Sequence, residues 1–365
     1  MGHDFAGRLA RANQQLERSD LDGLIVTPSA DLIYLAGYEP PPLERLTALV
    51  LRPGQDPVMM VPELERPRAA ASDAARLVEI EFWRDGDEPY DGVARLLEAN
   101  GAYGVTDSMW AMHLLGLQTA LADARFVTAA PLLSKLRSRK DEGEVQLLAR
   151  ASRSADETFR RVTGQRMEGR TEAQIAEALA STLVETGHDA ALFWIVGSGP
   201  NGASPHHDSA QREIRGGDPV VLDFGGRMKG YCSDMTRTVS VGEASEELKE
   251  VHEIVREAHE AAFEAVRPGV PAEDVDRAAR AVIEEAGYGG AFIHRTGHGI
   301  GLEEHEVPYL VEGNTEPLQP GMCFSIEPGI YLEGRFGVRI EDIVTVTGDG
   351  VERLNHAPRE LTVVA

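Results

Sequence analysis

The sequence has few cysteines, no long apolar run and a shortage of positive charge. Cys232 and Cys323 are its only cysteines, which is too few for a disulfide framework. It contains no 18-residue apolar run, so it predicts no segment that spans a membrane. Against 60 Asp and Glu stand only 36 Lys and Arg, and this net charge of −24 argues against binding to nucleic-acid phosphates. The first residues lack the apolar core of a secretory signal, so we expect a cytoplasmic protein.

The chain is long enough for two domains, because 365 residues exceed the length of one ordinary core. Short apolar segments that end at proline or glycine, such as "LDGLIVTPS" and "DPVMMVPE", predict an α/β unit at the start. After Pro131 long charged amphipathic helices alternate with strand pairs, and Thr171 and Ser245 are the expected N-caps of two of these helices. We therefore expect an α/β (α+β) protein with domains over residues 1–132 and 133–365.

The segment "PVVLDFGGRMKGYCSDMTRTVSVG" predicts a hairpin that carries two aspartates. Asp223 and Asp234 lie 11 positions apart, and their midpoint falls between Met228 and Lys229, inside the turn. An antiparallel hairpin centred there would place the two carboxylates directly opposite each other, where like charges repel.

The segment "GMCFSIEPGIYLEGRFGVRIEDIVTVTG" predicts a second hairpin of the same kind. Glu327 and Glu341 lie 14 positions apart, their midpoint is Gly334, and both stand in otherwise apolar strands. The alternative is that all four acids face solvent on edge strands, but both pairs are symmetric about their own turns. Because an unpaired carboxylate is costly to bury, two opposed pairs favour a dinuclear metal site of the kind that recurs in hydrolases.

A third segment, "RTGHGIGLEEHE", surrounds His298 with glycines at positions 297, 299 and 301. So much backbone freedom indicates either a flexible turn or a bulky polar group close to the backbone. One imidazole added to four carboxylates makes an oxygen-rich ligand set, which suits Mn²⁺, Co²⁺ or Fe²⁺ at least as well as Zn²⁺.

Six motifs together resemble a known family, the pita-bread metallopeptidases, which include prolidase, aminopeptidase P and methionine aminopeptidase. In chain order they are "SGPNGASPHH", "VLDFGG", "CSDMTRT", "RTGHGIGLEEHE", "SIEPGIY" and "GVRIEDI". The part before them resembles the creatinase-type N-terminal domain of prolidase and aminopeptidase P. The resemblance implies a creatinase-like α/β domain over 1–132, and over 133–365 a pita-bread domain with a curved antiparallel sheet and flanking helices.

The resemblance also implies a metal centre with two divalent ions, for which we expect Mn²⁺. The residues that match the family's metal ligands are Asp223, Asp234, His298, Glu327 and Glu341. Of these, Asp234 and Glu341 would bridge the ions, His298 would bind one ion, and Glu327 would also act as general base.

Other matches concern the substrate and the reaction. His305 would help to stabilise the tetrahedral intermediate and His206 would lie near the substrate, whereas its neighbour His207 matches nothing and is expected to have no role. The matches to outer active-site positions are His294, Arg339 and Tyr331.

The expected substrates are small peptides with proline at the second position. Dipeptidases of the family often have an arginine four residues after the equivalent of His305, to hold the substrate carboxylate, but here Tyr309 stands there. We therefore expect an Xaa-Pro aminopeptidase. The alternative is an Xaa-Pro dipeptidase (prolidase) in which Arg339 or Arg335 holds the carboxylate.

Three further functions stay open from the sequence. A metal-free C–N hydrolase like creatinase, a hydrolase of an ectoine-type amide and a non-catalytic binding relative share the fold. The intact set of ligand residue types disfavours the first and the last. The family resemblance also implies a homodimer.

Overall fold

The computed structural model describes residues 3–365, and it divides the chain into two compact units after Arg137. Residues 1 and 2 of the expected first domain lie outside the described residues. The observed division falls at the end of helix α6 (Ala130–Ser138), whereas the boundary expected from the sequence, between residues 132 and 133, lies inside this helix. Helix α6 stays with the first unit because Leu136 O accepts a hydrogen bond from Tyr34 and Arg137 pairs with Asp31.

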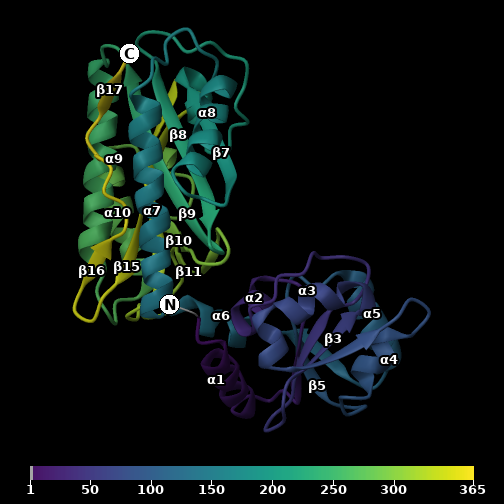
Figure 1. Cartoon of the computed structure of the whole chain (residues 1–365). Coiled ribbons are helices and arrows are strands. Elements are labelled where there is room, and N and C mark those ends of the chain that lie inside the picture. Colours follow the sequence, from purple (N-terminus) through teal and green to yellow (C-terminus); the bar gives the residue numbers. More distant parts are fainter. Residues whose placement is uncertain (1–2) are drawn as a thin grey trace. The chain divides into compact units, whose positions relative to one another are not determined.

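The N-terminal unit contains a six-stranded mixed sheet whose strand order is β4-β3-β2-β1-β5-β6. The strands are β1 (Gly23–Val26), β2 (Ala48–Leu51), β3 (Val58–Pro62), β4 (Glu79–Trp83), β5 (Ala102–Val105) and β6 (Arg125–Thr128). The remaining helices of this unit are α1 (Phe5–Glu17), α2 (Ala30–Ala36), α3 (Arg66–Ala71), α4 (Pro89–Ala94) and α5 (Ala111–Ala120), shown in Figure 1. The predicted apolar strands β1 to β3 are fully buried. Their side chains form the centre of this unit, as expected for strands covered on both faces.

The C-terminal unit contains two larger sheets and a two-stranded ladder. One sheet has the order β17-β9-β8-β7, a second has the order β11-β10-β12-β15-β16, and β13 pairs with β14. The strands are β7 (Ala190–Ser198), β8 (Pro219–Met228), β9 (Tyr231–Val241), β10 (Gly297–Gly299), β11 (Glu306–Leu310), β12 (Cys323–Ile326), β13 (Gly329–Leu332), β14 (Phe336–Arg339), β15 (Asp342–Val346), β16 (Val351–Arg353) and β17 (Thr362–Val364). All pairs except β17 with β9 are antiparallel.

Each large sheet of this unit has its own pair of helices and its own core. Helices α7 (Glu142–Thr163) and α8 (Glu172–Glu185) share a core with β7, β8 and β9. Helices α9 (Glu246–Ala265) and α10 (Ala272–Glu285) share a core with β12, β14 and β15. Figure 1 shows the long helices α9 and α10 running side by side. The C-terminal unit therefore has two halves, each a sheet packed against a pair of helices. Each half contains one of the two predicted carboxylate hairpins.

The helix boundaries follow the capping residues in the sequence. Thr171 and Ser245 accept hydrogen bonds from the backbone N–H of the third residue of α8 and of α9, as predicted. The charged amphipathic stretch that begins at Lys135 predicts one continuous helix, but the structure divides it, because Asp141 forms a capping box with Glu144 and starts α7 there. Across residues 3–365 no helix is both long and apolar enough to cross a membrane.

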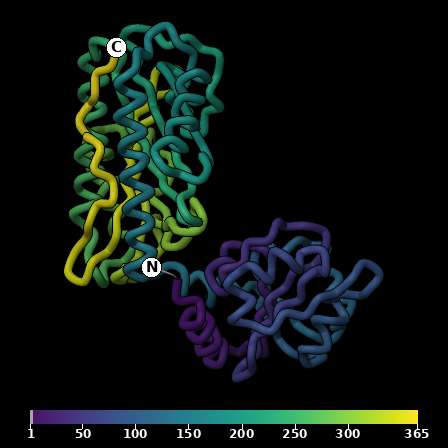
Figure 2. The backbone as a smooth tube through the Cα atoms, viewed as in Figure 1, coloured from purple at the N-terminus to yellow at the C-terminus, as the bar shows by residue number. Residues whose placement is uncertain are grey.

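The C-terminal segment contacts helices from both halves of the C-terminal unit. Figure 2 shows the segment after β16, in yellow, passing between α7 and α9. Arg353 pairs with Glu260 of α9, and Asn355 and His356 bind Asp156 of α7. Strand β17 then adds to the edge of β9 as its parallel neighbour.

Candidate metal centre and active site

The β8–β9 hairpin turns one residue later than the sequence suggested. Lys229 and Gly230 form the tight turn, with φ angles of 51° and 88°, and Met228 pairs with Tyr231. Such a two-residue turn with both φ angles positive suits the twist of a hairpin and fixes its register. Asp223 therefore pairs with Thr236, and Asp234 pairs with Gly225. The expectation of directly opposed aspartates was wrong, but the shift of two positions keeps both side chains on one face.

The second hairpin has the predicted register, but its ladder is interrupted at the two glutamates. Gly329 pairs with Arg339 on one side of the break and Ile326 pairs with Asp342 on the other, so Glu327 and Glu341 face each other between them. Pro328 has no N–H to continue the ladder. The backbone N–H of Glu327 donates instead to Thr296 O (2.8 Å), and that of Glu341 donates to Thr236 O (3.0 Å).

The glycines around His298 are explained by neighbouring strands. Strand β10 lies between β11 and β12, and a Cβ at Gly297 would collide with the carbonyl oxygen of Ser325. A Cβ at Gly299 would collide with the carbonyl oxygen of Val307. The polar group that approaches this backbone is therefore the protein's own main chain, and the segment is a buried strand with an irregular register after His298.

The two hairpins and β10 bring four carboxylates and one imidazole together. His298 Nε2 lies 3.6 Å from Asp234 Oδ2 and 3.3 Å from Glu327 Oε1. Three overlapping groups have ligand atoms within 4.8 Å of one another: Asp234, His298 and His305; His298, Glu327 and Glu341; Asp223, Asp234 and Glu341. Asp223, Asp234 and Glu341 are only 8%, 4% and 2% exposed, which excludes the alternative of solvent-facing acids.

The charges of this cluster fit bound cations. Burial raises the pKa values of Asp234 and Glu341 well above their ordinary values, and their carboxylate neighbours add to the effect. Burial likewise raises the pKa of Glu327 to about 7. Within residues 3–365, Asp234 Oδ1 and Glu341 Oε1 are buried oxygens without a hydrogen-bond partner, which metal ligation would satisfy.

One arginine offsets part of the negative charge. Arg339 is buried and its Nη2 donates to Asp223 Oδ2 at 2.5 Å. Four carboxylates and one guanidinium leave a net charge of −3 in the cluster, more than one divalent ion neutralises. The donor set thus fits two divalent ions.

Further hydrogen bonds orient the cluster. Arg339 also donates to the hydroxyl oxygens of Thr236 (3.1 Å) and Tyr331 (2.8 Å). Tyr331 lies 2.8 Å from Nε2 of His294. Burial lowers the pKa of His294 to about 4 and raises that of Tyr331 to about 12, so both are neutral near pH 7. Thr236 and Ser325 were not predicted from the sequence; their hydroxyls donate to Glu341 Oε2 (2.7 Å) and Glu327 Oε1 (3.1 Å).

The cluster forms the floor of a cleft of about 740 Å³ within the C-terminal unit. Its lining includes nine of the predicted site residues: His206, Asp223, Asp234, His294, His298, His305, Glu327, Arg339 and Glu341. The rings of His298 and His305 are 3.9 Å apart. Among residues 3–365, Tyr331 and Tyr309 do not belong to the cleft lining. The Tyr331 hydroxyl forms hydrogen bonds with two lining residues, His294 and Arg339. The Tyr309 ring stacks against a third lining residue, Arg295. Four lining residues were not predicted from the sequence: Arg295 and the apolar Phe193, Ile195 and Ile293.

The loop that carries His206 is held by a buried carboxylate. Glu172, at the start of α8, accepts hydrogen bonds from Ser198, Asn201 and Ala210. Its Oε2 also lies 2.8 Å from Nε2 of His207. His207, for which we expected no role, therefore ties its loop to the helix. Glu172 stands directly after the N-cap of α8, and helix N-termini favour negative charge. Its place in the sequence could therefore have indicated a structural role for this carboxylate.

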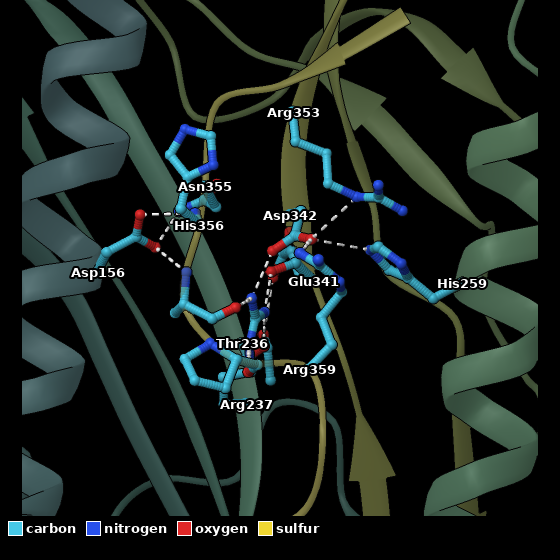
Figure 3. A network of polar contacts seen from close by, with 12 residues as sticks. Asp156, Thr236, Arg237, His259, Glu341, Asp342, Arg353, Asn355, His356 and Arg359 are labelled. Carbon is cyan, nitrogen blue, oxygen red and sulfur yellow. Dashed lines mark hydrogen bonds and ion pairs between the residues drawn. The ribbon is translucent and has the colours of Figure 1, made fainter.

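A second buried network lies behind Glu341, as Figure 3 shows. Arg237 donates to the carbonyl oxygens of Thr236 (2.9 Å) and Glu341 (2.6 Å) and to Asp342 Oδ1 (2.5 Å). It also donates to the carbonyl oxygens of Ala357 and Pro358 in the C-terminal segment. Burial opposes the charge of Asp342, but Arg237, His259 and Arg359 hold its pKa below the ordinary value. This arginine thereby joins the backbones of β9, of Glu341 and of the C-terminal segment.

The fold and this site are those of a peptidase family. The description "Metallopeptidase family M24" matches residues 146–348, and "Creatinase/Prolidase N-terminal domain" matches residues 8–139. The chain belongs to metallopeptidase family M24 and is an exopeptidase of that family, with a creatinase-like N-terminal unit and a pita-bread C-terminal unit.

Similar proteins match along nearly the whole chain. The "probable dipeptidase PepE" of Mycobacterium tuberculosis is 48% identical over 99% of this chain and 96% of its own. The "Xaa-Pro dipeptidase" of Lactobacillus helveticus is 34% identical over 98% of both chains. The crystal structure of dipeptidase PepE from Mycobacterium ulcerans superposes with a TM-score of 0.95 at 48% identity, covering 99% of this chain and 98% of that one. These likenesses favour the dipeptidase alternative over the aminopeptidase that Tyr309 suggested.

Proposed function

We propose that the chain is a dipeptidase that hydrolyses Xaa-Pro dipeptides at a centre holding two divalent metal ions. The observation that carries the proposal is the buried cluster of four carboxylates and one imidazole, which opens with His206 and His305 into one cleft. Dipeptide length and proline preference are carried over from the PepE and Xaa-Pro dipeptidase relatives. An Xaa-Pro aminopeptidase is the competing function.

The proposed ligands are Asp223, Asp234, His298, Glu327 and Glu341. Asp234 and Glu341 would lie between the two ions, because each has ligand atoms close to His298 on one side and to Asp223 on the other. We propose Mn²⁺ as the metal, since oxygen ligands with a single nitrogen suit it, with Co²⁺, Fe²⁺ or Zn²⁺ as substitutes. When bound, such ions would polarise the scissile carbonyl and lower the pKa of an attacking water.

The chain's own groups would move the protons. Glu327 accepts a hydrogen bond from Ser325 on Oε1, which keeps its carboxylate turned toward His298. In this position it would take a proton from the attacking water and later deliver it to the proline nitrogen that leaves. His305 would donate a hydrogen bond to the oxyanion that develops on the carbonyl, and exposed His206 would hold the substrate across the cleft.

The first test compares two substrates after metal removal. The purified protein is stripped with chelator and reloaded with Mn²⁺, and cleavage of an Xaa-Pro dipeptide and an Xaa-Pro-Xaa tripeptide is followed. We expect metal-dependent cleavage of the dipeptide alone. Cleavage of the tripeptide alone would support the aminopeptidase, and cleavage of neither, with metal bound, would point to a different amide substrate.

A matched variant checks that the carboxylate cluster is the metal site. Glu304 lines the cleft but belongs to none of the three ligand groups. Glu304→Gln should still bind two Mn²⁺ per chain by elemental analysis, whereas Glu341→Gln should bind fewer. Equal metal content in both variants would contradict the ligand assignment.

Two further properties complete the proposal. We propose a reducing compartment, the cytoplasm, because Cys232 and Cys323 are both free and buried thiols. We also propose a homodimer on the ground of the family resemblance. Sedimentation that shows only monomers at micromolar concentration would contradict the second point.

A further inference from the structure

Arg295 is a cation in the cleft wall without an acidic partner. Its guanidinium carbon lies 4.3 Å from the centre of the Tyr309 ring, and its half-buried side chain lines the same cleft as His206 and His305. Across the described residues 3–365 this guanidinium has the ring contact but no ion pair. A cation held on an aromatic face keeps its donors available for a ligand.

The two arginines that the sequence offers as alternative carboxylate ligands, Arg339 and Arg335, are already engaged. Arg339 is buried and donates to Asp223, Tyr331 and Thr236. Arg335 stands in the β13–β14 turn, is outside the cleft lining and pairs with Glu247 of α9. The sequence-based expectation that one of these two holds a substrate carboxylate therefore lacks support in the described structure.

The ring below Arg295 is fixed relative to the metal-ligand cluster. Tyr309 pairs with His298 across the β10–β11 ladder, and its carbonyl oxygen accepts a hydrogen bond from Asn314 at 2.7 Å. Arg295 lines the same cleft as the proposed reacting groups Glu327 and His305.

We propose that Arg295, carried on the ring of Tyr309, is the anchor that receives the free carboxylate of the substrate's second residue. This inference rests on the proposed dipeptidase function. A dipeptide has its carboxylate one residue beyond the scissile bond, whereas a longer peptide has a neutral amide there. Arginine binds carboxylate through two parallel N–H donors, so this position distinguishes the two. Dipeptidases of the family often carry an arginine at the position of Tyr309. In this chain the guanidinium of Arg295 would take the role of that arginine.

The experiment uses substrates that share the scissile bond and differ only in the carboxylate. For the Mn²⁺-loaded protein, kcat/KM is measured for an Xaa-Pro dipeptide and for its C-terminal amide. We expect a strong preference for the acid, and in Arg295→Gln a fall of the acid-to-amide ratio by about 10- to 100-fold, mostly through KM of the acid. Arg295→Lys should recover part of the ratio, because it restores charge but not the paired donors.

Two variants control for general damage. Arg335→Gln removes a surface arginine that pairs with Glu247 and should leave the ratio unchanged. Tyr309→Phe keeps the aromatic face and should retain the preference, whereas Tyr309→Ala should reduce it.

A binding measurement is independent of turnover. Free proline and prolinamide are compared as competitive inhibitors, and Arg295→Gln should weaken proline selectively. An unchanged acid-to-amide ratio in Arg295→Gln, or an equal loss on both substrates, would overturn the inference. Failure of the unsubstituted protein to cleave the dipeptide would instead overturn the proposed function, so the two failures are distinguishable.

Discussion

The two hairpins that build the centre reach the same result by different means. The β8–β9 hairpin is a continuous ladder of ten and eleven residues, and both of its aspartates project from regular strands. The β12–β15 hairpin breaks into two short ladders, and its glutamates stand in the gap. The regular hairpin is held by its own backbone. The interrupted one depends on Thr296 and Thr236, which accept the two hydrogen bonds that its ladder does not make.

The side chains of the two hairpins are also held in position by different partners. A glutamate has one more rotatable bond than an aspartate, so Glu327 and Glu341 require hydroxyl partners to hold them, and Ser325 and Thr236 supply these. Asp223 is instead oriented by Arg339. The following predictions test this comparison, beginning with the largest expected effect.

Glu327→Gln should lower kcat by a factor on the order of 10² to 10⁴, because the amide cannot accept the proton of the attacking water. The measurement is kcat on an Xaa-Pro dipeptide with bound metal determined in parallel. Glu304→Gln is the control for a carboxylate in the cleft. A kcat within a factor of two of the unsubstituted protein would contradict the role of Glu327.

Arg237→Leu should destabilise the protein by about 3–5 kcal/mol, because it leaves the buried charge of Asp342 without its nearest partner. Urea unfolding followed by circular dichroism measures this. Arg359 binds the other oxygen of Asp342 at 3.0 Å but is partly exposed, so Arg359→Gln should cost only about 1 kcal/mol. Equal losses in the two variants would show that the arginines share the charge evenly.

Glu172→Gln should lower kcat/KM by about 10- to 100-fold, because the loop that carries His206 loses the charge that holds it. His207→Gln removes one of the contacts to Glu172 and should have a smaller effect in the same direction. Metal content should stay unchanged in both variants, which separates a loss of position from a loss of ligands. Loss of metal in Glu172→Gln would contradict this account.

The metal-free protein should lose stability as pH rises. Burial raises the pKa of Glu327 from 4.5 to about 7, so between these values the folded carboxyl keeps a proton that the unfolded chain has released. The unfolding free energy therefore falls with increasing pH in this window. Thermal melts in chelator between pH 5 and pH 8 measure the slope, which should be shallower in Glu327→Gln. Bound Mn²⁺ should remove most of the dependence.

The smallest expected effect concerns the turn that sets the first register. Lys229 adopts a φ of 51°, in the left-handed region that disfavours residues with a side chain. Lys229→Asn should stabilise the protein by up to about 1 kcal/mol, since asparagine tolerates this conformation in tight hairpin turns. Gly230→Ala, at a φ of 88°, should destabilise it by about 1 kcal/mol. A rise in the melting temperature of Gly230→Ala would contradict the observed turn.

The sequence determined the composition of the centre and the elements that supply it. The apolar strands, the N-caps Thr171 and Ser245 and the symmetric spacing of Glu327 and Glu341 can all be deduced locally, because they depend on backbone propensity and on residue spacing. The register of Asp223 and Asp234 was missed by one turn position, since the φ angles of Lys229 and Gly230 decide it.

Only the tertiary structure decided which groups hold the centre in place and which face the substrate. Thr236, Arg237 and Asp342 belong to strands that neighbour the ligands, but their contacts join residues more than one hundred positions apart. Glu172 and His207 meet across 35 positions, and Arg295 reaches the Tyr309 ring of β11 from the segment that precedes β10. Spacing along one chain segment carries no information about such pairs, because they form only when separate elements pack against one another.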